Sequence, residues 1–339
     1  MRRLLPVLSL CTLAAAVPTA GIAKAPPNSW AQGEIRTVVA SGLMSTSVPS
    51  FRPDDPLTQG ELAELAAGLT GSVPVSPVNP SGTVTIAQLD AKLVWALGLG
   101  DAGGQFLRAG RLAGLSPPSR FGTEVVARLI GLRPNHPAGH DELEPLPGDL
   151  ATRAEAAYSA ARVLHFRGWE VPGVIDASLM FELPAFTPWQ KRVLATAVRL
   201  IGFPYVWGGT SEGARSALGG PHGGFDCSGF VWRVYKLQTY TDGGALAQTL
   251  RGRTTYAMSG EVSRSQRIAF AKLQPGDVVF FGPRGPRSKP AEVDHTGIYL
   301  GAGWMIHSSE NGVALTLLEG WYRKRFAWAR RPLAEAGLV

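Results

Sequence analysis

The pattern of apolar residues changes once along the chain, and this change limits the folds that the chain can adopt. Residues 28–170 alternate short helical patterns with proline and glycine breaks, whereas residues 187–331 are richer in aromatic residues, glycine and strand-like runs. A chain of 339 residues is also longer than one core usually serves. We therefore expect a small all-α repeat domain, then a linker over residues 171–186, then an α+β domain with helices packed on an antiparallel sheet.

The first residues have the pattern of a secretory signal peptide. Arg2 and Arg3 precede an apolar run, residues 4–17, that is too short for a comfortable membrane span, and small residues follow as far as Ala25. We interpret residues 1–25 as a signal peptide, with an uncleaved membrane anchor as the alternative. The net charge of +7 comes without a dense basic patch interleaved with aromatic residues, so no nucleic-acid partner is indicated.

Two stretches of the first region resemble each other. "FRPDDPLTQGELAELAAGL" begins at Phe51, and "PLPGDLATRAEAAYSAARVL" begins at Pro145. In each, a threonine stands three residues before a glutamate at the start of an Ala/Leu-rich helix, which is the pattern of a capping box. The threonines are Thr58 and Thr152, and a weaker middle copy begins at Thr83. The pattern predicts three related helical units.

These stretches also resemble a known repeat. "SWAQGEIRTVVASGLM" followed by "FRPDDPLTQGELAEL" is similar to an S-layer homology repeat, and "ATRAEAAYSAARVL" is similar to the second half of another. The resemblance implies that the region binds an anionic cell-wall polymer. The basic residue of the family's Thr-Arg-x-Glu motif is replaced by Gln59 in the first copy and survives as Arg153 in the third. A helical spacer that has lost its polymer ligand is therefore the alternative.

The second region contains a cysteine that would have no partner after export. Only two cysteines occur in the chain, and removal of the signal peptide would leave Cys227 in the stretch "GGFDCSGFVWRVYK". Such a thiol is buried and inert, paired with another molecule, or reactive. Because an apolar helix is predicted to begin directly after it, Cys227 would lie at a helix N-terminus, where the helix dipole favours the thiolate and lowers the pKa of a cysteine.

Of the six histidines, two lie in a predicted β-hairpin, "EVDHTGIYLGAGWMIHSSENG". If Leu300 faces Trp304 across the turn, His295 and His307 lie on the same face of the sheet, within side-chain reach of each other. His295 would then take the proton of the cysteine thiol, and His307 would fix the ring and tautomer of His295. His222, five residues before the cysteine, is a further histidine that could approach it.

Five ordered blocks of residues 187–331 carry a second resemblance. "PYVWGGT", "GFDCSGFV", "LQPGDVVFF", "VDHTGIYLG" and "MIHSS" are similar to the NlpC-type cell-wall peptidase family. The resemblance implies a papain-like cysteine peptidase that cuts peptidoglycan stem peptides, typically between the γ-carboxyl of D-glutamate and a diamino acid. By position, Cys227 is implied to be the nucleophile, His295 the base and His307 the third, polar member.

The same resemblance implies further site residues. Tyr205 would point its hydroxyl at the catalytic centre and help to hold the oxyanion, while Asp226 and Ser228 would shape the substrate pocket. Two departures lie near the implied cleft: the glycine-rich link over residues 211–222, and "GPRGPRSKPAE" before the first hairpin strand. We expect no cofactor and no metal, although a zinc site formed by the cysteine and the two hairpin histidines is an alternative.

Together these patterns predict a secreted, cell-wall-associated, monomeric cysteine endopeptidase whose partners are peptidoglycan stem peptides and an anionic wall polymer. The alternative from a different class is a non-catalytic wall-binding protein with a retired peptidase domain.

Overall fold

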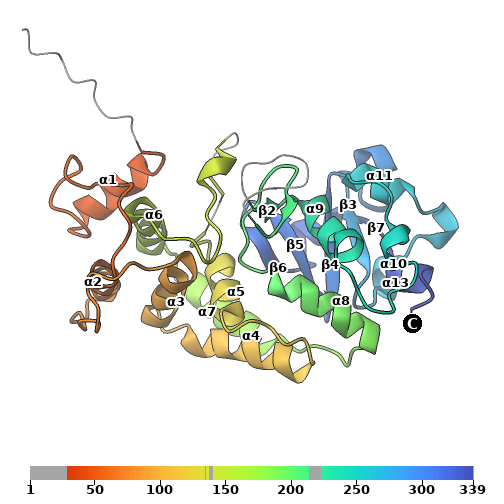
Figure 1. Ribbon diagram of the computed structural model, residues 1–339, viewed down its shortest axis with the longest axis horizontal. Coiled ribbons are helices and arrows are strands. Elements are labelled where there is room, and N and C mark those ends of the chain that lie inside the picture. Colours follow the sequence, from red (N-terminus) through yellow and green to blue (C-terminus); the bar gives the residue numbers. More distant parts are fainter. Residues whose placement is uncertain (1–28, 134, 137–139, 214–222, 339) are drawn as a thin grey trace, which may run out of the picture.

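The computed structural model describes residues 29–133, 135–136, 140–213 and 223–338. A helical region is followed by an α+β domain with a five-stranded antiparallel sheet (Figure 1), which confirms the predicted fold class. The predicted signal peptide and His222 lie outside the described residues. Within these described ranges, no helix combines the length and apolar character needed to cross a membrane.

Three helices of the first region begin at a capping threonine, as the repeat pattern predicts. Thr58 and Thr85 each form a complete capping box at the starts of α2 and α3. Thr152 caps α6 but forms only half of a box, because the Glu155 carboxylate binds Arg133 and a histidine instead of the cap backbone. These helices are α2 (Gln59–Thr70), α3 (Ile86–Ala96) and α6 (Arg153–Leu164).

The three capped units are joined by a closed ring of backbone hydrogen bonds. The N–H of Leu57 donates to the carbonyl of Ala151, the N–H of Ala151 to that of Val84, and the N–H of Val84 to that of Leu57, with N···O distances of 2.8, 2.9 and 3.1 Å. The first two N–H groups of each capped helix also donate to carbonyls in the loop before another capped helix. The weak middle copy that begins at Thr83 therefore completes this ring.

Arg153 lies inside this arrangement and not on its surface. It is 4% exposed, and its guanidinium donates to the carbonyls of Met44 and Phe51 at 2.7 and 2.8 Å and pairs with Glu61. The basic residue of the Thr-Arg-x-Glu motif thus links the first and third units, and its guanidinium is not exposed to a wall polymer.

The remaining helices of the first region are α1 (Gln32–Ala40), α4 (Gly100–Leu112), α5 (Phe121–Leu129) and α7 (Glu170–Leu179). The helix α1 packs against α6 at the outer end of the molecule, while α4, α5 and α7 lie between the ring and the second domain (Figure 1). The position of α7 corrects the linker that the sequence predicts over residues 171–186. Glycine and proline in "VPGV" suggest a break, but Val174 and Phe181 are buried, and the ring of Phe181 lies 5.0 Å from Phe106 and 5.3 Å from Trp304. These aromatic contacts make one continuous core across both regions.

In the second domain the strand order is β6-β5-β4-β3-β7, with every pair antiparallel. The strands are β3 (Val278–Phe281), β4 (His295–Gly301), β5 (Trp304–Ser309), β6 (Gly312–Leu317) and β7 (Phe326–Arg330). Two helices of this domain pack by their apolar faces into the main core, namely α8 (Pro188–Arg199) and α9 (Cys227–Trp232). The helix α9 continues as a π-helical turn over Arg233–Leu237. Shorter elements complete the domain: β1 (Thr210–Ser211), β2 (Gly224–Phe225), α10 (Leu246–Thr249), α11 (Thr255–Gly260), α12 (Gly320–Arg325) and α13 (Pro332–Glu335).

The register of the β4–β5 hairpin decides where the two histidines point. Ile298 pairs with Ile306 and Tyr299 with Met305, which is the predicted register, while a bulge at the turn pairs Gly301 with Trp304. In the described part of the chain, the pairing of β4 with β5 runs from the turn as far as Ile298, and His295 lies beyond the paired residues. The helix α9 contacts both strands, and its first residue, Cys227, lies beside the backbone of Thr296 near the start of β4.

Candidate active site

Cys227 is the first residue of α9, and its sulfur lies against the sheet. Asp226, in extended conformation, caps the helix by accepting a hydrogen bond of 2.5 Å from the N–H of Gly229. The backbone N–H groups of Ser228 and Thr296 lie near the sulfur and favour its anionic form. Since Thr296 follows directly after the first residue of β4, the helix start and the strand start meet at one point. The thiol is 9% exposed.

A half-buried arginine holds the start of α9 in place. Arg253 donates to the carboxylate of Asp226 at 3.1 Å, to the hydroxyl of Ser228 at 2.6 Å and to the carbonyl of Gly209 at 3.2 Å. Ser228 in turn donates to Asp226 at 3.0 Å. The two residues that flank Cys227 are thus bound to each other and to one guanidinium. Sequence reasoning missed Arg253, because nothing in its own stretch indicates that it lies beside residues about 25 positions earlier.

The two histidines form a hydrogen-bonded pair that continues to a threonine. Nε2 of His295 lies 2.8 Å from Nδ1 of His307, and Nε2 of His307 lies 2.9 Å from the Oγ1 of Thr316 on β6. If His295 carries its proton on Nε2, then His307 accepts at Nδ1 and donates from Nε2 to Thr316. This arrangement leaves Nδ1 of His295 without a proton and able to act as a base. Thr316 had no signal in the sequence analysis, because only the register of β5 with β6 brings it to His307.

Burial sets the charges of this site. Burial, followed by the neighbouring carboxylate of Asp226, raises the pKa of Cys227 to about 12. Burial also lowers the pKa of His295 to about 4 and that of His307 well below its ordinary value. Near pH 7 the site therefore holds a neutral thiol and neutral imidazoles. The prediction that the helix N-terminus lowers the pKa of Cys227 is wrong, because burial and Asp226 together outweigh the N–H groups.

Tyr205 lies beside the cysteine, with its backbone held by the helical region. Its N–H donates to the side-chain oxygen of Asn135 at 3.2 Å. Burial raises the pKa of the half-buried phenol, and Cys227 and Asp226 raise it further. The hydroxyl is thus protonated and available as a donor. The structure brings together all six residues that the sequence analysis singled out, namely Tyr205, Asp226, Cys227, Ser228, His295 and His307.

Among the residues that the structure describes, no group of three or more histidine, cysteine or acidic side chains is arranged to hold a metal ion. Three of the four ring nitrogens of the histidine pair contact each other or Thr316.

Two family models match the chain. The model of the NlpC/P60 family covers residues 202–331, which includes the cysteine, both histidines and the whole sheet. Residues 202–331 form an NlpC/P60 domain. An S-layer homology domain matches residues 25–63, which include α1 and the capped start of α2. Both resemblances found in the sequence are thereby confirmed.

Curated relatives of the NlpC/P60 domain are named as peptidases. The chain is 36% identical over 142 residues to a probable peptidoglycan endopeptidase of Bacillus subtilis, covering 42% of this chain and 34% of the relative. It is 29% identical over 151 residues to a γ-D-glutamyl-L-lysine dipeptidyl-peptidase of the same organism, covering 43% and 42%. It is 33% identical over 144 residues to a murein DD-endopeptidase of Escherichia coli, covering 42% and 45%. The chain thus spans less than half of the length of each of these relatives. The NlpC/P60 domain is homologous to cysteine peptidoglycan endopeptidases.

Proposed function

We propose that this protein is a secreted, cell-wall-associated cysteine endopeptidase that hydrolyses an amide bond in peptidoglycan stem peptides. The observation that carries the proposal is that Cys227 lies at the start of β4, whose first residue is His295. His295 is hydrogen-bonded to His307, and His307 is hydrogen-bonded to Thr316. For the bond, we propose the one between D-glutamate, through its γ-carboxyl, and a diamino acid, which is named for one relative. Another relative carries the name of a DD-endopeptidase, so a different peptide bond is a defined outcome of the test.

The proposed reaction begins from neutral groups. As the sulfur of Cys227 attacks the amide carbonyl, the thiol proton passes to Nδ1 of His295, so that the thiolate forms only as it reacts. The imidazolium then gives this proton to the leaving amine, and the C–N bond breaks to leave a thioester. A water molecule, deprotonated by the same imidazole, attacks the thioester and releases the acid and the thiol.

His307 and Thr316 act as positioning residues in this scheme. The hydrogen bond between Nε2 of His295 and Nδ1 of His307 holds the first ring, and the bond between Nε2 of His307 and Thr316 holds the second. Neither residue carries a negative charge, so the imidazolium of His295 is stabilised by hydrogen bonding and not by an ion pair. We expect His307→Ala to retain more activity than His295→Ala.

The oxyanion is placed between α9 and Tyr205. The N–H of Cys227 belongs to the first turn of a helix, where backbone donors have no intrahelical acceptor. The protonated phenol of Tyr205 is the proposed second donor. One such donor commonly contributes about 3 kcal/mol of transition-state stabilisation.

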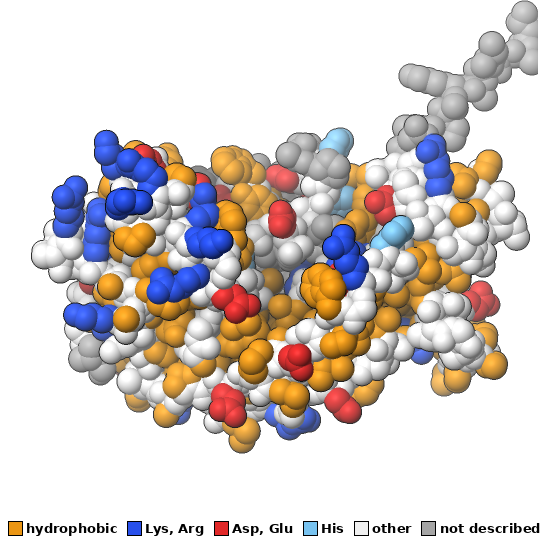
Figure 2. Space-filling view, turned by 180° about the vertical axis from the view of Figure 1, so that it is seen from behind, with side chains coloured by type: hydrophobic (Ala, Val, Ile, Leu, Met, Phe, Trp, Pro, Cys, Tyr) orange, Lys and Arg blue, Asp and Glu red, His pale blue; other side chains and the backbone are white. Residues whose placement is uncertain are grey.

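The helical region is the proposed attachment to the wall. An S-layer homology domain is the observation that supports binding of an anionic cell-wall polymer. The other end of the molecule, which the NlpC/P60 domain forms, carries a gathering of Lys and Arg side chains (Figure 2). An anionic surface such as the wall would attract this patch. Because Arg153 is buried between units, Arg153→Ala is expected to destabilise the ring and is not a clean test of polymer binding.

The test is to incubate the purified protein with defined muropeptides and to identify new free amines by mass spectrometry. Wild-type protein is expected to release the diamino acid side of the stem peptide. Cys227→Ser is expected to abolish turnover while the melting temperature stays within about 2 °C, since a thiol-to-hydroxyl exchange changes little volume. If the wild type and Cys227→Ser both bind peptidoglycan and neither cuts any bond, the protein is a wall-binding protein with a retired peptidase domain.

A further inference from the structure

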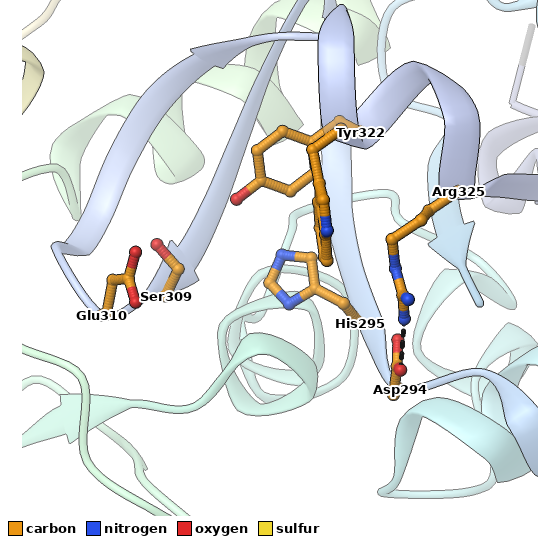
Figure 3. A pocket seen from close by; sticks show the side chains of 7 residues that line it. Asp294, His295, Ser309, Glu310, Tyr322 and Arg325 are labelled. Atoms are coloured by element: carbon orange, nitrogen blue, oxygen red, sulfur yellow. Dashed lines mark hydrogen bonds and ion pairs between the residues drawn. The ribbon is translucent and has the colours of Figure 1, made fainter. Parts of the chain in front are cut away.

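A cavity of about 560 Å³ opens beside the catalytic histidine and is not part of the machinery described above. It lies on the face of the sheet that carries both histidines, and α12 forms its roof (Figure 3). We call it the leaving-side pocket. Its lining residues are Asp294, His295, Ser309, Glu310, Trp321, Tyr322 and Arg325.

The chemistry of the proposed reaction decides which part of the substrate this pocket faces. The acyl part is bonded to Cys227, at the tip of α9, while His295 must deliver its proton to the leaving amine. The residue that carries this amine therefore lies over the imidazole, on the side of His295 away from the helix. His295 is a wall of the pocket and Cys227 is not.

The charges that line the pocket do not balance. Arg325 pairs with Asp294, and its guanidinium lies 4.5 Å from the centre of the Trp321 ring. Glu310 has no cationic partner among the residues that the structure describes. Figure 3 shows its carboxylate beside Ser309, across the pocket from the paired arginine, with the phenol of Tyr322 between them. The pocket thus offers one unpaired carboxylate to a bound cation.

We propose that the leaving-side pocket receives the diamino acid and that Glu310 binds the ammonium group at the end of its side chain. This inference rests on the proposed function and adds a specificity to it. In a crosslinked stem peptide the same amine is acylated and carries no charge. The pocket therefore favours stem peptides whose diamino acid is not crosslinked.

The test compares pairs of substrates in which the side-chain amine is either free and charged or acetylated and neutral. Peptides of L-alanyl-γ-D-glutamyl-L-lysine and the same peptide with an acetylated side-chain amine are supplied to the full chain, alongside the corresponding pair made with meso-diaminopimelate. For wild type, kcat/KM is expected to be about five- to tenfold higher for the free amine, the range of a partly exposed charge-assisted hydrogen bond. Glu310→Gln is expected to bring this ratio to about one, through loss on the free-amine substrate only.

A matched variant removes the same charge outside the pocket. Glu319 is exposed, precedes α12 and does not line the pocket, so Glu319→Gln is expected to keep the wild-type ratio. If Glu310→Gln keeps the ratio, or lowers kcat/KM equally for both substrates, the assignment of Glu310 is overturned while the peptidase function stands. If wild type cleaves none of the four peptides at any bond, the proposed bond falls, and the pocket assignment falls with it.

Discussion

At the scale of single residues, Cys227 and His295 are both kept uncharged by burial. A thiol with a pKa of about 12 and an imidazole with a pKa of about 4 do not form a stable thiolate–imidazolium pair. Catalysis by such a pair couples proton transfer to attack, so the nucleophile is protected from reagents that need a pre-formed thiolate. The environment of the sulfur, and not only its place at a helix tip, thus decides its reactivity.

This environment predicts slow alkylation of Cys227. The thiol should lose its proton only as the pH approaches about 12, so the rate of reaction with iodoacetamide is expected to be low at pH 7 and to rise roughly tenfold per pH unit through pH 10. Intact-mass spectrometry of the modified protein measures this rate, with Cys227→Ser as the blank. A plateau of fast alkylation between pH 5 and 9 would show a resident ion pair and contradict the prediction.

Sequence reasoning succeeded for residues whose relation is local and failed where partners are distant. The hairpin register placed both histidines on one face because side chains alternate along a strand. Arg253 and Thr316 were missed because their contacts depend on how loops and a third strand fold back. The depth of Cys227 was missed for the same reason, and the direction of its pKa shift was wrong as a result.

At the scale of elements, the active site depends on how closely β5 approaches β4. Gly297 lies opposite the second histidine, and a Cβ atom added there would come within 2.9 Å of both the Cβ of His307 and the carbonyl oxygen of Ile306. One of these contacts is with backbone, so a side chain at this position forces the strands apart. The glycine allows the two imidazoles to meet at 2.8 Å.

Gly297→Ala is therefore expected to damage the histidine pair more than the fold. Strain of this kind commonly costs about 1–3 kcal/mol, so we expect a lower melting temperature together with a loss of kcat/KM of at least tenfold. Gly260→Ala in α11 is the matched control, because a Cβ there meets nothing closer than 3.4 Å. If Gly297→Ala is destabilised but keeps full activity, the spacing of these strands does not limit catalysis.

The boundaries of elements show the same division between local and distant signals. Apolar residues in an unbroken run form β3, and a threonine cap at Thr187 begins α8, so both elements depend on signals in consecutive residues. The linker prediction failed at α7, where packing of Val174 and Phe181 against other elements overrides the proline and glycine nearby. The π-helical turn after α9 likewise had no sequence signal.

At the scale of the whole molecule, the helical region braces the catalytic domain. The buried guanidinium of Arg128 donates to the carbonyls of Gly202 and of Asn311, which lies in the turn between β5 and β6. The N–H of Asn135 donates to the carbonyl of Glu310 in the same turn at 2.8 Å, while its side chain accepts from the N–H of Tyr205. The region that resembles a wall anchor therefore also fixes the ends of the cleft.

Removal of this brace is expected to affect both stability and turnover. Arg128→Gln leaves buried carbonyls without a donor, at a cost of about 2–4 kcal/mol, and frees the turn that carries Glu310. We expect a melting temperature lower by at least 4 °C and a several-fold loss of kcat/KM on a muropeptide. Calorimetry and a chromatographic cleavage assay measure the two effects. The exposed Arg111→Gln, which removes the same charge from α4, should change neither. Wild-type values for Arg128→Gln would mean that the two regions act independently.

The ring of hydrogen bonds between Leu57, Val84 and Ala151 has a consequence for how such a chain can evolve. Each unit supplies a donor to one neighbour and an acceptor to the other. Deletion of any one unit therefore leaves a backbone polar group without a hydrogen-bond partner on each of the two remaining units. A copy can then lose every residue that once touched a ligand and still be retained, because its backbone is indispensable to the other two. The backbone of the middle copy is therefore needed by the other two copies, whether or not that copy touches a ligand.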